Sequence, residues 1–475
     1  MKIYQRFTQH IPDKKSRAIA FFDLDGTLID THSVKAVFAE QLRAGDIGVS
    51  ELVDLASMSV RFMLQRGNFE DALEESLANM AGSQVDDYAE LGDKVFQEKL
   101  FQTLFPEMKA VLRRHRELGH ELVIITSATR FQVQPIADYL GIEEILCTEM
   151  EEKDGVYTGK LEGTPCYGDN KLKLARALCR QHKMSLGNCY FYSNGAEDLP
   201  LLEKVGHPVA VNADKKLIER AERAGWTLLK PTSRSSRGIA DFARTAGTFA
   251  SIIPSIAAGL PFRFRGAKTE SINFSMSTWG EIGSLIAGLK LHVEGEEHLW
   301  SERPAVFVFN HQSAMDTLIM ARLLRRDFTG IGKKEISRQP IMGPALKTFD
   351  AVLIDRENIK DPREALQPAV EALKEGRSVI IAPEGTRSRD EKLGTFKSGA
   401  FHLAQQAGVP VVPVVIHNAL DSLSRNGGFI RPAEVAVTVL EPISTARWTP
   451  KSVSGNRQKI RQQFLKTLGQ ADERD

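Results

Sequence analysis

Two acidic side chains follow a short apolar run near the start of the chain, in the stretch FFDLDGTLID. Asp23 and Asp25 stand two residues apart, and Gly26 permits close approach of the backbone. One carboxylate can attack a phosphorus atom to form an aspartyl-phosphate, while the other carries the proton of the leaving group. A phosphoester also needs its charge neutralised, which calls for Mg²⁺ on the carboxylates and a nearby lysine. These residues therefore predict phosphoryl chemistry.

A second pair of reactive side chains lies in VFVFNHQSAMDTL, residues 306–318. Asp316 follows His311 by five residues, at the expected first turn of a helix. A carboxylate bonded to an imidazole fixes its tautomer and makes it a general base. Such a base can take the proton of a substrate hydroxyl as that hydroxyl attacks a thioester carbonyl, and no serine or cysteine nucleophile is needed. The spacing alone also suits a histidine with a purely structural role. The choice between a structural and a catalytic histidine therefore depends on the motifs that follow.

Basic residues and a glycine turn accompany three later apolar runs. IAPEGTRS (381–388) contains a glycine that lets backbone N–H groups face an anion and an arginine that offers a fork of donors. LIDREN (353–358) and GIGKKEI (330–336) supply further cations, and Lys397 is a weaker candidate. The main candidates are Lys333, Arg356, Glu384, Gly385, Thr386 and Arg387. Together they predict a phosphate site at the ends of successive strands.

The apolar runs that hold these residues alternate with helical patterns. In the first half the runs are 18–24, 121–127, 188–194 and 207–212, and in the second half 305–310, 350–355, 378–383, 409–416 and 434–440. This alternation predicts an α/β fold, with a doubly wound parallel sheet in the first half and a second α/β domain after it. Ligands then bind at the carboxyl ends of the strands. The prolines of VPVVPVVI disfavour a central place for that strand.

The chain has 475 residues, more than one hydrophobic core usually serves, so two or three domains are expected. KPTSRSSRG (230–238) is polar and rich in serine, which makes it the best boundary candidate. We predict a first domain over 15–228, a linker over 229–274 and a second domain over 275–475.

The composition narrows the classes of partner and compartment. The net charge of +1 removes a global basic field, and with it the main reason to expect nucleic acid. The four cysteines fit neither a zinc nor a C-x-x-C pattern and read as reduced thiols. The first residues hold no apolar core of signal-peptide length, so the cytosolic side is the expected compartment.

One apolar stretch suggests contact with a membrane. Residues 245–262 carry no charge, and Arg263 and Arg265 follow at once. Arginines beside apolar residues suit a membrane surface, although a buried hairpin of short helices fits equally well. No run of about 18 strongly apolar residues predicts a span. We therefore expect a protein of the cytoplasm or of the cytoplasmic face of a membrane.

The stretch around Asp23 resembles the haloacid-dehalogenase-like hydrolases, and the resemblance spans roughly 18–225. It implies that Asp23 is the nucleophile and Asp25 the general acid/base. The helical insert, approximately 31–105, resembles the cap of the phosphoserine-phosphatase-like branch, subfamily IB.

Two later motifs of the same family supply its phosphate-binding groups. Ser127, which ends ELVIITS, matches the family's hydroxyl. Lys171 in GDNKLK matches its lysine, with Lys173 as a close rival.

The resemblance also implies a Mg²⁺ site. YSNGAEDLPLL (192–202) matches the fourth motif, in which one Asp precedes a second by four residues. Here the earlier position is an asparagine, which offers an oxygen but no charge. The expected metal ligands are Asp23, Asp25, Asn194 and Asp198. The weakened site leaves the phosphatase activity open.

NHQSAMD and APEGTRS, in this order, resemble two blocks of the 1-acylglycerol-3-phosphate acyltransferases, with Ala382 in place of a phenylalanine. The resemblance covers roughly 275–445. It implies a fatty acyl donor, either acyl-CoA or acyl-carrier protein, and lysophosphatidate as the acceptor. His311 would be the base and Asp316 its partner, and the six candidates of the phosphate site would shape the acceptor site. This family works on membrane-resident acceptors, which favours contact with a membrane surface.

The leading hypothesis is an acyltransferase that acts on the sn-2 hydroxyl of 1-acylglycerol-3-phosphate to give phosphatidate, fused to a phosphomonoesterase-like domain. Two alternatives stay open. In one, the main activity is a Mg²⁺-dependent phosphatase of phosphoserine or a lipid phosphate. In the other, the protein is a lipid-binding scaffold without catalysis.

Overall fold

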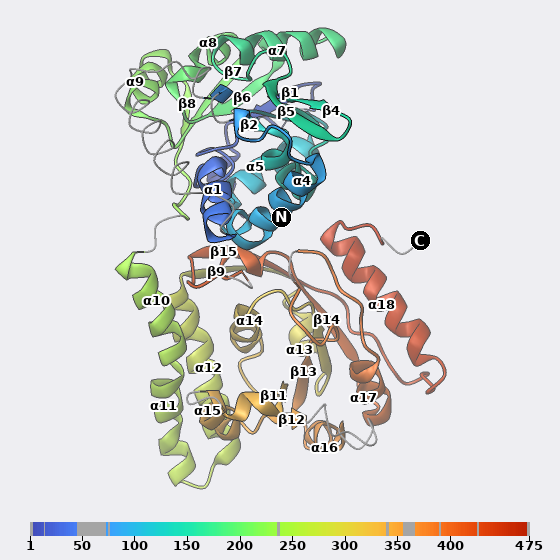
Figure 1. The fold of residues 1–475 in the computed structure, drawn as a ribbon. Coiled ribbons are helices and arrows are strands. Elements are labelled where there is room, and N and C mark those ends of the chain that lie inside the picture. Colours follow the sequence, from blue (N-terminus) through green and yellow to red (C-terminus); the bar gives the residue numbers. More distant parts are fainter. Residues whose placement is uncertain are drawn as a thin grey trace. The chain divides into compact units, whose positions relative to one another are not determined.

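The computed structural model describes residues 3–13, 15–44, 73–74, 77–234, 238–338, 342–354, 366–388, 391–424 and 427–472. The chain forms two compact units, Tyr4–Ser236 and Arg237–Asp475, the second of which includes Met1–Ile3. Each unit has its own sheet (Figure 1). The stretch 229–274, expected to be a linker, is helical from residue 239 on apart from short turns, because Ile252 and Ile272 join the core of the second unit.

The sheet of the first unit is parallel throughout, in the order β3-β2-β1-β6-β7-β8. Its strands are β1 (Ile19–Phe22), β2 (Glu121–Thr129), β3 (Glu144–Thr148), β6 (Tyr190–Ser193), β7 (His207–Val211) and β8 (Thr227–Leu229). β4 (Met150–Lys153) and β5 (Val156–Leu161) form a separate antiparallel pair. All four side chains of β1 are buried, as in a strand covered on both faces. The predicted doubly wound sheet is confirmed.

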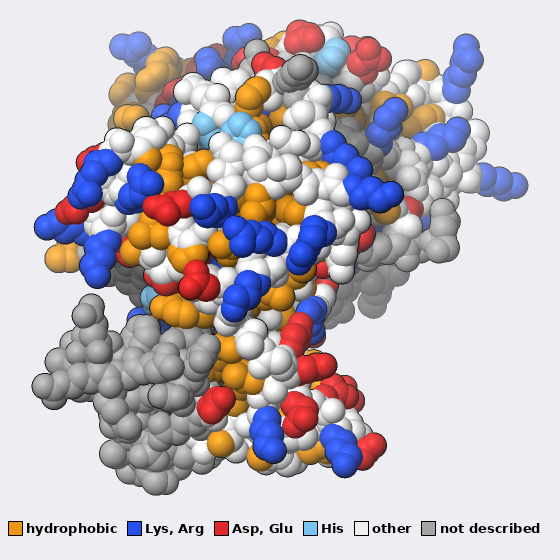
Figure 2. All heavy atoms as spheres, turned by 90° about the horizontal axis from the view of Figure 1, so that it is seen from above, with side chains coloured by type: hydrophobic (Ala, Val, Ile, Leu, Met, Phe, Trp, Pro, Cys, Tyr) orange, Lys and Arg blue, Asp and Glu red, His pale blue; other side chains and the backbone are white. Residues whose placement is uncertain are grey.

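Helices cover both faces of this sheet. α5 (Pro106–Glu117) and α6 (Arg130–Leu140) pack on β2. α7 (Asp169–Gln181), α8 (Leu199–Leu202) and α9 (Lys215–Ala224) share a core with Phe21 of β1, whereas the next residue, Phe22, contacts His115 of α5. This alternation is the period of two expected of a strand. Figure 2 shows that the face seen from above, over α7–α9, carries many Lys and Arg side chains.

The described part of the predicted cap, approximately 31–105, is helical. It contains α1 (Ser33–Ala44) and α4 (Val85–Val95), followed by a π-helical turn over Phe96–Leu100. Glu40 of α1 is 2% exposed, and its carboxylate lies 3.0 Å from the Lys94 amine and 2.8 Å from the Lys99 amine. These lysines hold the pKa of Glu40 at about 2. The ion pairs therefore join the cap helices.

The sheet of the second unit has the order β12-β11-β13-β10-β14-β15-β9. Its strands are β9 (Leu289–Glu294), β10 (Val306–Phe309), β11 (Phe328–Lys333), β12 (Val352–Ile354), β13 (Ser378–Ile381), β14 (Val411–Ile416) and β15 (Ala433–Val439). Among the strand pairs that the structure describes in this sheet, β14 and β15 alone run antiparallel. The second α/β domain is thus confirmed, with a mixed sheet.

The expectation that the prolines of β14 disfavour a central place in the sheet is wrong, because β14 lies between β10 and β15. The carbonyl of Pro413 accepts a hydrogen bond from the Leu440 N–H. The side of Pro413 that lacks an N–H therefore also faces β15. Pro413 stands at the end of the β14–β15 ladder, because the pairing of the two strands begins at Val414. A proline is tolerated there because few ladder bonds are lost.

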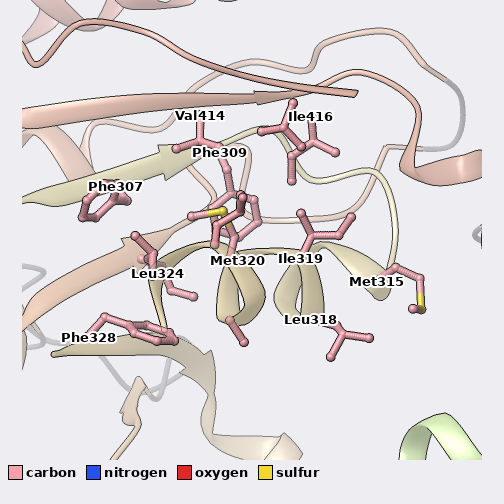
Figure 3. Packing of buried hydrophobic residues seen from close by; sticks show 14 of the residues in the cluster. Phe307, Phe309, Met315, Leu318, Ile319, Met320, Leu324, Phe328, Val414 and Ile416 are labelled. Atoms are coloured by element: carbon pink, nitrogen blue, oxygen red, sulfur yellow. The ribbon is translucent and has the colours of Figure 1, made fainter. Parts of the chain in front are cut away.

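Two helical layers sandwich this second sheet. α14 (Met315–Leu324) and α12 (Lys268–Ala287) share one core with Phe307 and Phe309 of β10. Figure 3 shows these phenylalanines together with Ile319 and Met320 of α14. On the other face, α16 (Gln367–Lys374), α17 (Gly399–Ala407) and α18 (Val453–Leu468) pack over Val306 and Val308. The remaining helices are α10 (Ile239–Ala250), α11 (Ile252–Phe264), α13 (His298–Ser301) and α15 (Met342–Thr348).

Candidate functional sites

In the first unit, Lys171 joins two carboxylates at the carboxyl edge of the sheet. Its Nζ donates to Asp23 Oδ1 across 2.8 Å and to Asp198 Oδ2 across 2.9 Å. Asp23 directly follows β1 and Asp198 lies shortly after β6, and the parallel pairing of these strands brings both to one edge. Ser193 Oγ donates to Asp198 Oδ2 across 2.6 Å. The predicted lysine therefore lies at the site, whereas Lys173 is exposed and bonds Asn170.

Burial and mutual charge set the protonation of this group. The pKa of Asp23 is raised to about 7, chiefly by burial and also by Asp198, although Lys171 acts to lower it. Burial also lowers the pKa of Lys171, but the Asp198 and Asp23 carboxylates outweigh this and hold it above its usual value. Lys171 is therefore a permanent cation between the two acids, suited to an anionic ligand.

Asp25 is directed to the cap rather than to Lys171. Its carboxylate accepts the Ser33 N–H at 2.7 Å and the Ser33 hydroxyl at 3.2 Å, at the first residue of α1. Burial raises the pKa of Asp25, and the Ser33 backbone N–H opposes this. Ser127 is half-buried in β2, and the pairing of Phe22 with Ile124 places it at the same edge as Asp23.

The oxygen atoms near Lys171 fit a hard cation in part. Within the described part of the chain, Asp198 Oδ1 is buried without a hydrogen-bond partner, and Asp23 Oδ2 accepts a long bond of 3.4 Å from Thr27. A Cβ built on Gly26, which has a φ of +76°, would lie 2.2 Å from Asn194 Nδ2, so this amide adjoins the turn after Asp25. Among the described residues no group of three or more His, Cys, Asp or Glu side chains is arranged to hold a metal ion. Oxygen donors of this kind suit Mg²⁺.

A buried cluster of histidines and tyrosines in the same unit was not anticipated from the sequence. Tyr192 Oη lies 2.8 Å from His10 Nε2 and 2.7 Å from His115 Nε2. His115 Nδ1 lies 2.7 Å from His120 Nδ1, and Tyr190 stacks on His207. Burial, together with the smaller effect of neighbouring histidines, lowers the pKa of His10 to about 4 and that of His115 to about 2. Histidines spread over the chain gave no periodic signal of this cluster.

In the second unit, His311 and Asp316 form a hydrogen-bonded pair after β10. His311 Nδ1 lies 2.8 Å from Asp316 Oδ2, which also accepts the backbone N–H groups of Gln312 and Ser313, each at 2.8 Å. Asp316 is fully buried, whereas the His311 side chain is 24% exposed. Because Nδ1 is bonded to the acid, Nε2 is the nitrogen that can exchange a proton with a ligand.

Glu384 connects this pair to the glycine turn after β13. Its Oε1 accepts the His311 N–H at 2.7 Å, and its Oε2 accepts the Gly394 N–H at 2.8 Å and the Ser388 hydroxyl at 3.1 Å. The Ser388 N–H in turn donates to the His311 carbonyl at 2.8 Å. Burial raises the pKa of Glu384, against the hydrogen bonds from the His311 and Gly394 backbones. Glu384, which is predicted to shape the acceptor site, accepts hydrogen bonds from within the protein on both of its carboxylate oxygens.

The remaining residues of the predicted phosphate site are distributed around this turn. Gly385 has a φ of +77°, and a Cβ there would lie 3.0 Å from Lys397 Nζ. Arg387 is half-buried and Thr386 is exposed. The backbone of Lys333 ends β11, while Arg356 lies outside the described residues.

Two polar residues next to His311 were missed although they stand in the same motif. The Asn310 side chain bonds both backbone groups of Ile416, each at 2.8 Å, and so fixes the end of β10 to β14. Ser313 is buried, and its Oγ donates to the Leu423 carbonyl at 2.6 Å. Polar residues inside a catalytic motif were the available signal.

Comparisons with known proteins agree with both halves. Residues 20–203 match the model of the haloacid dehalogenase-like hydrolases, and residues 290–417 match that of the acyltransferases. The first unit is similar to a protein named histidinol-phosphatase from Neisseria meningitidis, 32% identical over 219 residues, which are 44% of this chain and 97% of the relative.

Two proteins named 1-acyl-sn-glycerol-3-phosphate acyltransferase are similar to the second unit. The one from Saccharomyces cerevisiae is 34% identical over 187 residues, covering 39% of this chain and 61% of the relative. The one from Limnanthes douglasii is 32% identical over 192 residues, covering 39% of this chain and 67% of the relative. The chain therefore belongs to the haloacid dehalogenase-like hydrolases through its first unit and to the acyltransferases through its second.

Proposed function

We propose that the second unit transfers a fatty acyl group to the sn-2 hydroxyl of 1-acylglycerol-3-phosphate to give phosphatidate. Acyl-CoA or acyl-carrier protein would supply the thioester. The observation that carries this proposal is the 2.8 Å contact between His311 Nδ1 and a buried Asp316 carboxylate, which leaves the other ring nitrogen for an acceptor hydroxyl. The names of the yeast and Limnanthes relatives support this choice of substrate.

The arrangement suggests a single base-assisted transfer. His311 Nε2 takes the hydroxyl proton while the oxygen attacks the thioester carbonyl, and Asp316 stabilises the imidazolium that forms. The carbon–sulfur bond breaks, the thiolate leaves, and the imidazolium returns the proton to it. Lys397 lies next to Gly385, and Arg387 follows it by two residues. These two side chains would hold the acceptor phosphate, with Lys333 and Arg356 as further candidates from the sequence.

This proposal is tested by replacing His311 with alanine. Pure protein is incubated with lysophosphatidate and oleoyl-CoA, and the lipids are analysed by mass spectrometry. We expect phosphatidate from the wild type and loss of transfer in His311→Ala by a factor of about 10³ or more. His402→Ala, on α17 of the same unit, is the matched control and should retain activity. Undiminished transfer in a folded His311→Ala protein would remove the base.

A second activity, phosphomonoester hydrolysis, is favoured by the group around Lys171. Asp23 would attack the phosphorus atom, Lys171 would bind the phosphoryl oxygens, and Asp25, released from Ser33, would carry the leaving-group proton. Mg²⁺ bound by Asp23, Asp198 and Asn194 would neutralise charge on the phosphoryl group. The substrate class is phosphoserine or a lipid phosphate.

Release of inorganic phosphate from a panel of such esters, with and without Mg²⁺, tests this activity. Asp23→Asn should abolish release while His311→Ala preserves it. If instead the folded wild type binds vesicles but turns over neither class of substrate, the scaffold alternative holds.

We also infer that α10–α12 lie on the cytoplasmic face of a membrane. By length and composition alone, Ile239–Phe264 could cross a bilayer: its most apolar window of 18 residues has a mean hydropathy of 1.3, and 28% of that window is buried. Several large apolar side chains on these helices are exposed, among them Ile239 (90%), Phe242 (65%), Phe264 (85%) and Leu285 (80%). Arg263 and Arg265 would meet anionic headgroups. Vesicle flotation that is lost in Phe242→Glu but kept in Phe274→Tyr would support this contact.

A further inference from the structure

The His311–Asp316 pair is held by a turn that depends on a distant loop. Asp316 is positioned by backbone donors from Gln312 and Ser313, so its place follows that of the turn. The Ser313 hydroxyl, fully buried, donates to the Leu423 carbonyl at 2.6 Å and accepts the Met315 N–H at 3.2 Å. The turn that orients the acid is therefore anchored on residue 423.

The loop that carries Leu423 is closed by Ser422 and Arg431. The Arg431 N–H donates to the Ser422 carbonyl at 2.8 Å, and the Ser422 hydroxyl donates to the Arg431 carbonyl at 3.0 Å. Ser422 is buried, so these bonds face no competition from water. The position of Leu423 is thus coupled to that of Arg431.

Helix α10 holds Arg431 at the far end of this chain of contacts. Arg431 Nη1 donates to Asp241 Oδ2 at 2.8 Å, and the two side chains are only 14% and 11% exposed. Asp241 also binds Arg244 at 2.6 Å, and the neighbouring Ile430 N–H donates to Thr245 Oγ1 at 2.8 Å. Two adjacent residues of the loop are therefore fixed to successive turns of α10.

We propose that Arg431 is a positioning residue for acyl transfer: by binding Asp241 it fixes the loop that holds Ser313, and through Ser313 it orients the His311–Asp316 pair. The proposal rests on the proposed acyltransferase activity of this unit. The contacts that run from Asp241 through Arg431 and Ser422 to Ser313 do not include the glycine turn after β13. That turn meets the pair separately, through Glu384 and Ser388. Loss of the link should therefore slow the chemical step and leave substrate affinity unchanged.

Arg431→Met tests the link, and Arg377→Met is its matched control. Arg377 makes a partly buried ion pair with Asp350 at 3.2 Å, before β13 and so at the strand end opposite to His311. We expect kcat to fall about tenfold or more in Arg431→Met, with each KM within about twofold of the wild type. Arg431→Lys keeps the charge and should retain most of kcat. Thermal unfolding of each variant shows that it is folded at the assay temperature.

The nuclear magnetic resonance signal of the His311 Nδ1 proton gives a readout that does not need turnover. It is assigned in protein with isotope-labelled histidine by its absence in His311→Ala. In Arg431→Met this signal should shift or broaden, and in Arg377→Met it should stay in place. An unchanged signal together with a kcat equal to that of Arg377→Met would overturn the proposal. If the wild type transfers no acyl group, the proposed function fails, while the proton signal still decides whether Arg431 positions the pair.

Discussion

Lys171 Nζ and Asp23 Oδ1 lie 2.8 Å apart although 148 residues separate them in the chain. The same amine binds Asp198, so one cation balances two buried acids. The group resembles a buried ion triad in which every member depends on the others, and such groups are costly to break at one position.

Replacing Lys171 by methionine leaves Asp23 and Asp198 buried without their cation. We expect the free energy of unfolding to fall by about 3–5 kcal/mol, as for other buried pairs broken on one side. Urea unfolding followed by circular dichroism measures this change. Lys173→Met, on the exposed side of the same helix, should change stability by less than about 0.5 kcal/mol. Equal effects in the two variants would contradict the assigned role of Lys171.

Asn194 lies next to Gly26 and supplies no charge to the predicted Mg²⁺ site. The variant Asn194→Asp should therefore bind Mg²⁺ more tightly. The added carboxylate should raise the affinity for Mg²⁺ about tenfold, since a charge at contact distance is worth at least ~1.4 kcal/mol. Isothermal titration calorimetry with Mg²⁺ measures the affinity, and phosphate release gives the second readout. Asn188→Asp, exposed before β6, controls for net charge. Unaltered Mg²⁺ affinity would show that residue 194 is no ligand.

The sequence was sufficient to place the catalytic candidates at the sheet edge. Asp23 and His311 each end an apolar run, and parallel strands bring such ends together, so their grouping with Asp198 and with the glycine turn at Gly385 followed from the alternation of elements. This inference requires only the positions at which the strands end, and short apolar runs in the sequence mark those positions well.

The partners of those residues could not be predicted in the same way. Glu384 binds the His311 backbone across 73 residues, and Asp25 binds Ser33 instead of facing Lys171. A carboxylate after a strand can meet a ligand, a helix end or a neighbouring loop, and the residue type is the same in all three cases. Only the packed structure distinguishes them, because the choice depends on donors brought in by tertiary contacts.

Glu384→Gln should disrupt the turn that carries His311. Both carboxylate oxygens accept backbone N–H groups, from His311 and from Gly394, whereas glutamine presents a donor at one of them. We expect a loss of about 1–3 kcal/mol in stability, and a fall in acyl transfer larger than the unfolded fraction explains. Glu371→Gln on α16 is the control. Mass spectrometry of phosphatidate measures the acyl transfer, and thermal unfolding measures the stability. Intact transfer would mean that Glu384 is not needed to hold His311.

The histidine cluster predicts that the first unit loses stability in mild acid. The pKa of His10 is about 4 in the fold against an ordinary 6.5, so the unfolded chain binds the proton first. Its contribution, about 3 kcal/mol, is present above pH 6.5 and is lost as the pH falls from 6.5 toward 4. Tyr192, His207 and His115 face His10. His120, Tyr190 and Arg114 adjoin the other histidines of the cluster.

Thermal unfolding measured between pH 7.5 and pH 4.5 tests this expectation. His10→Gln keeps a hydrogen bond to Tyr192 and should flatten the pH dependence, while His32→Gln, at an exposed site of the same unit, should not. The same slope in both variants would contradict the role of the cluster.

Alanine variants of Gly385 and Gly376 distinguish the effect of backbone strain from the effect of losing a phosphate contact. Both have positive φ, +77° and +88°, so alanine at either costs about 1 kcal/mol. A Cβ at 376 meets nothing within 4 Å, whereas one at 385 lies 3.0 Å from Lys397 Nζ and pushes that amine aside. Gly385→Ala should therefore raise the KM for lysophosphatidate several-fold with little change in the KM for the acyl donor, and Gly376→Ala should change neither. Steady-state kinetics with each substrate varied in turn measures both constants. If the two variants changed the KM values equally, the acceptor phosphate would lie away from Lys397, because backbone strain alone would then account for both changes.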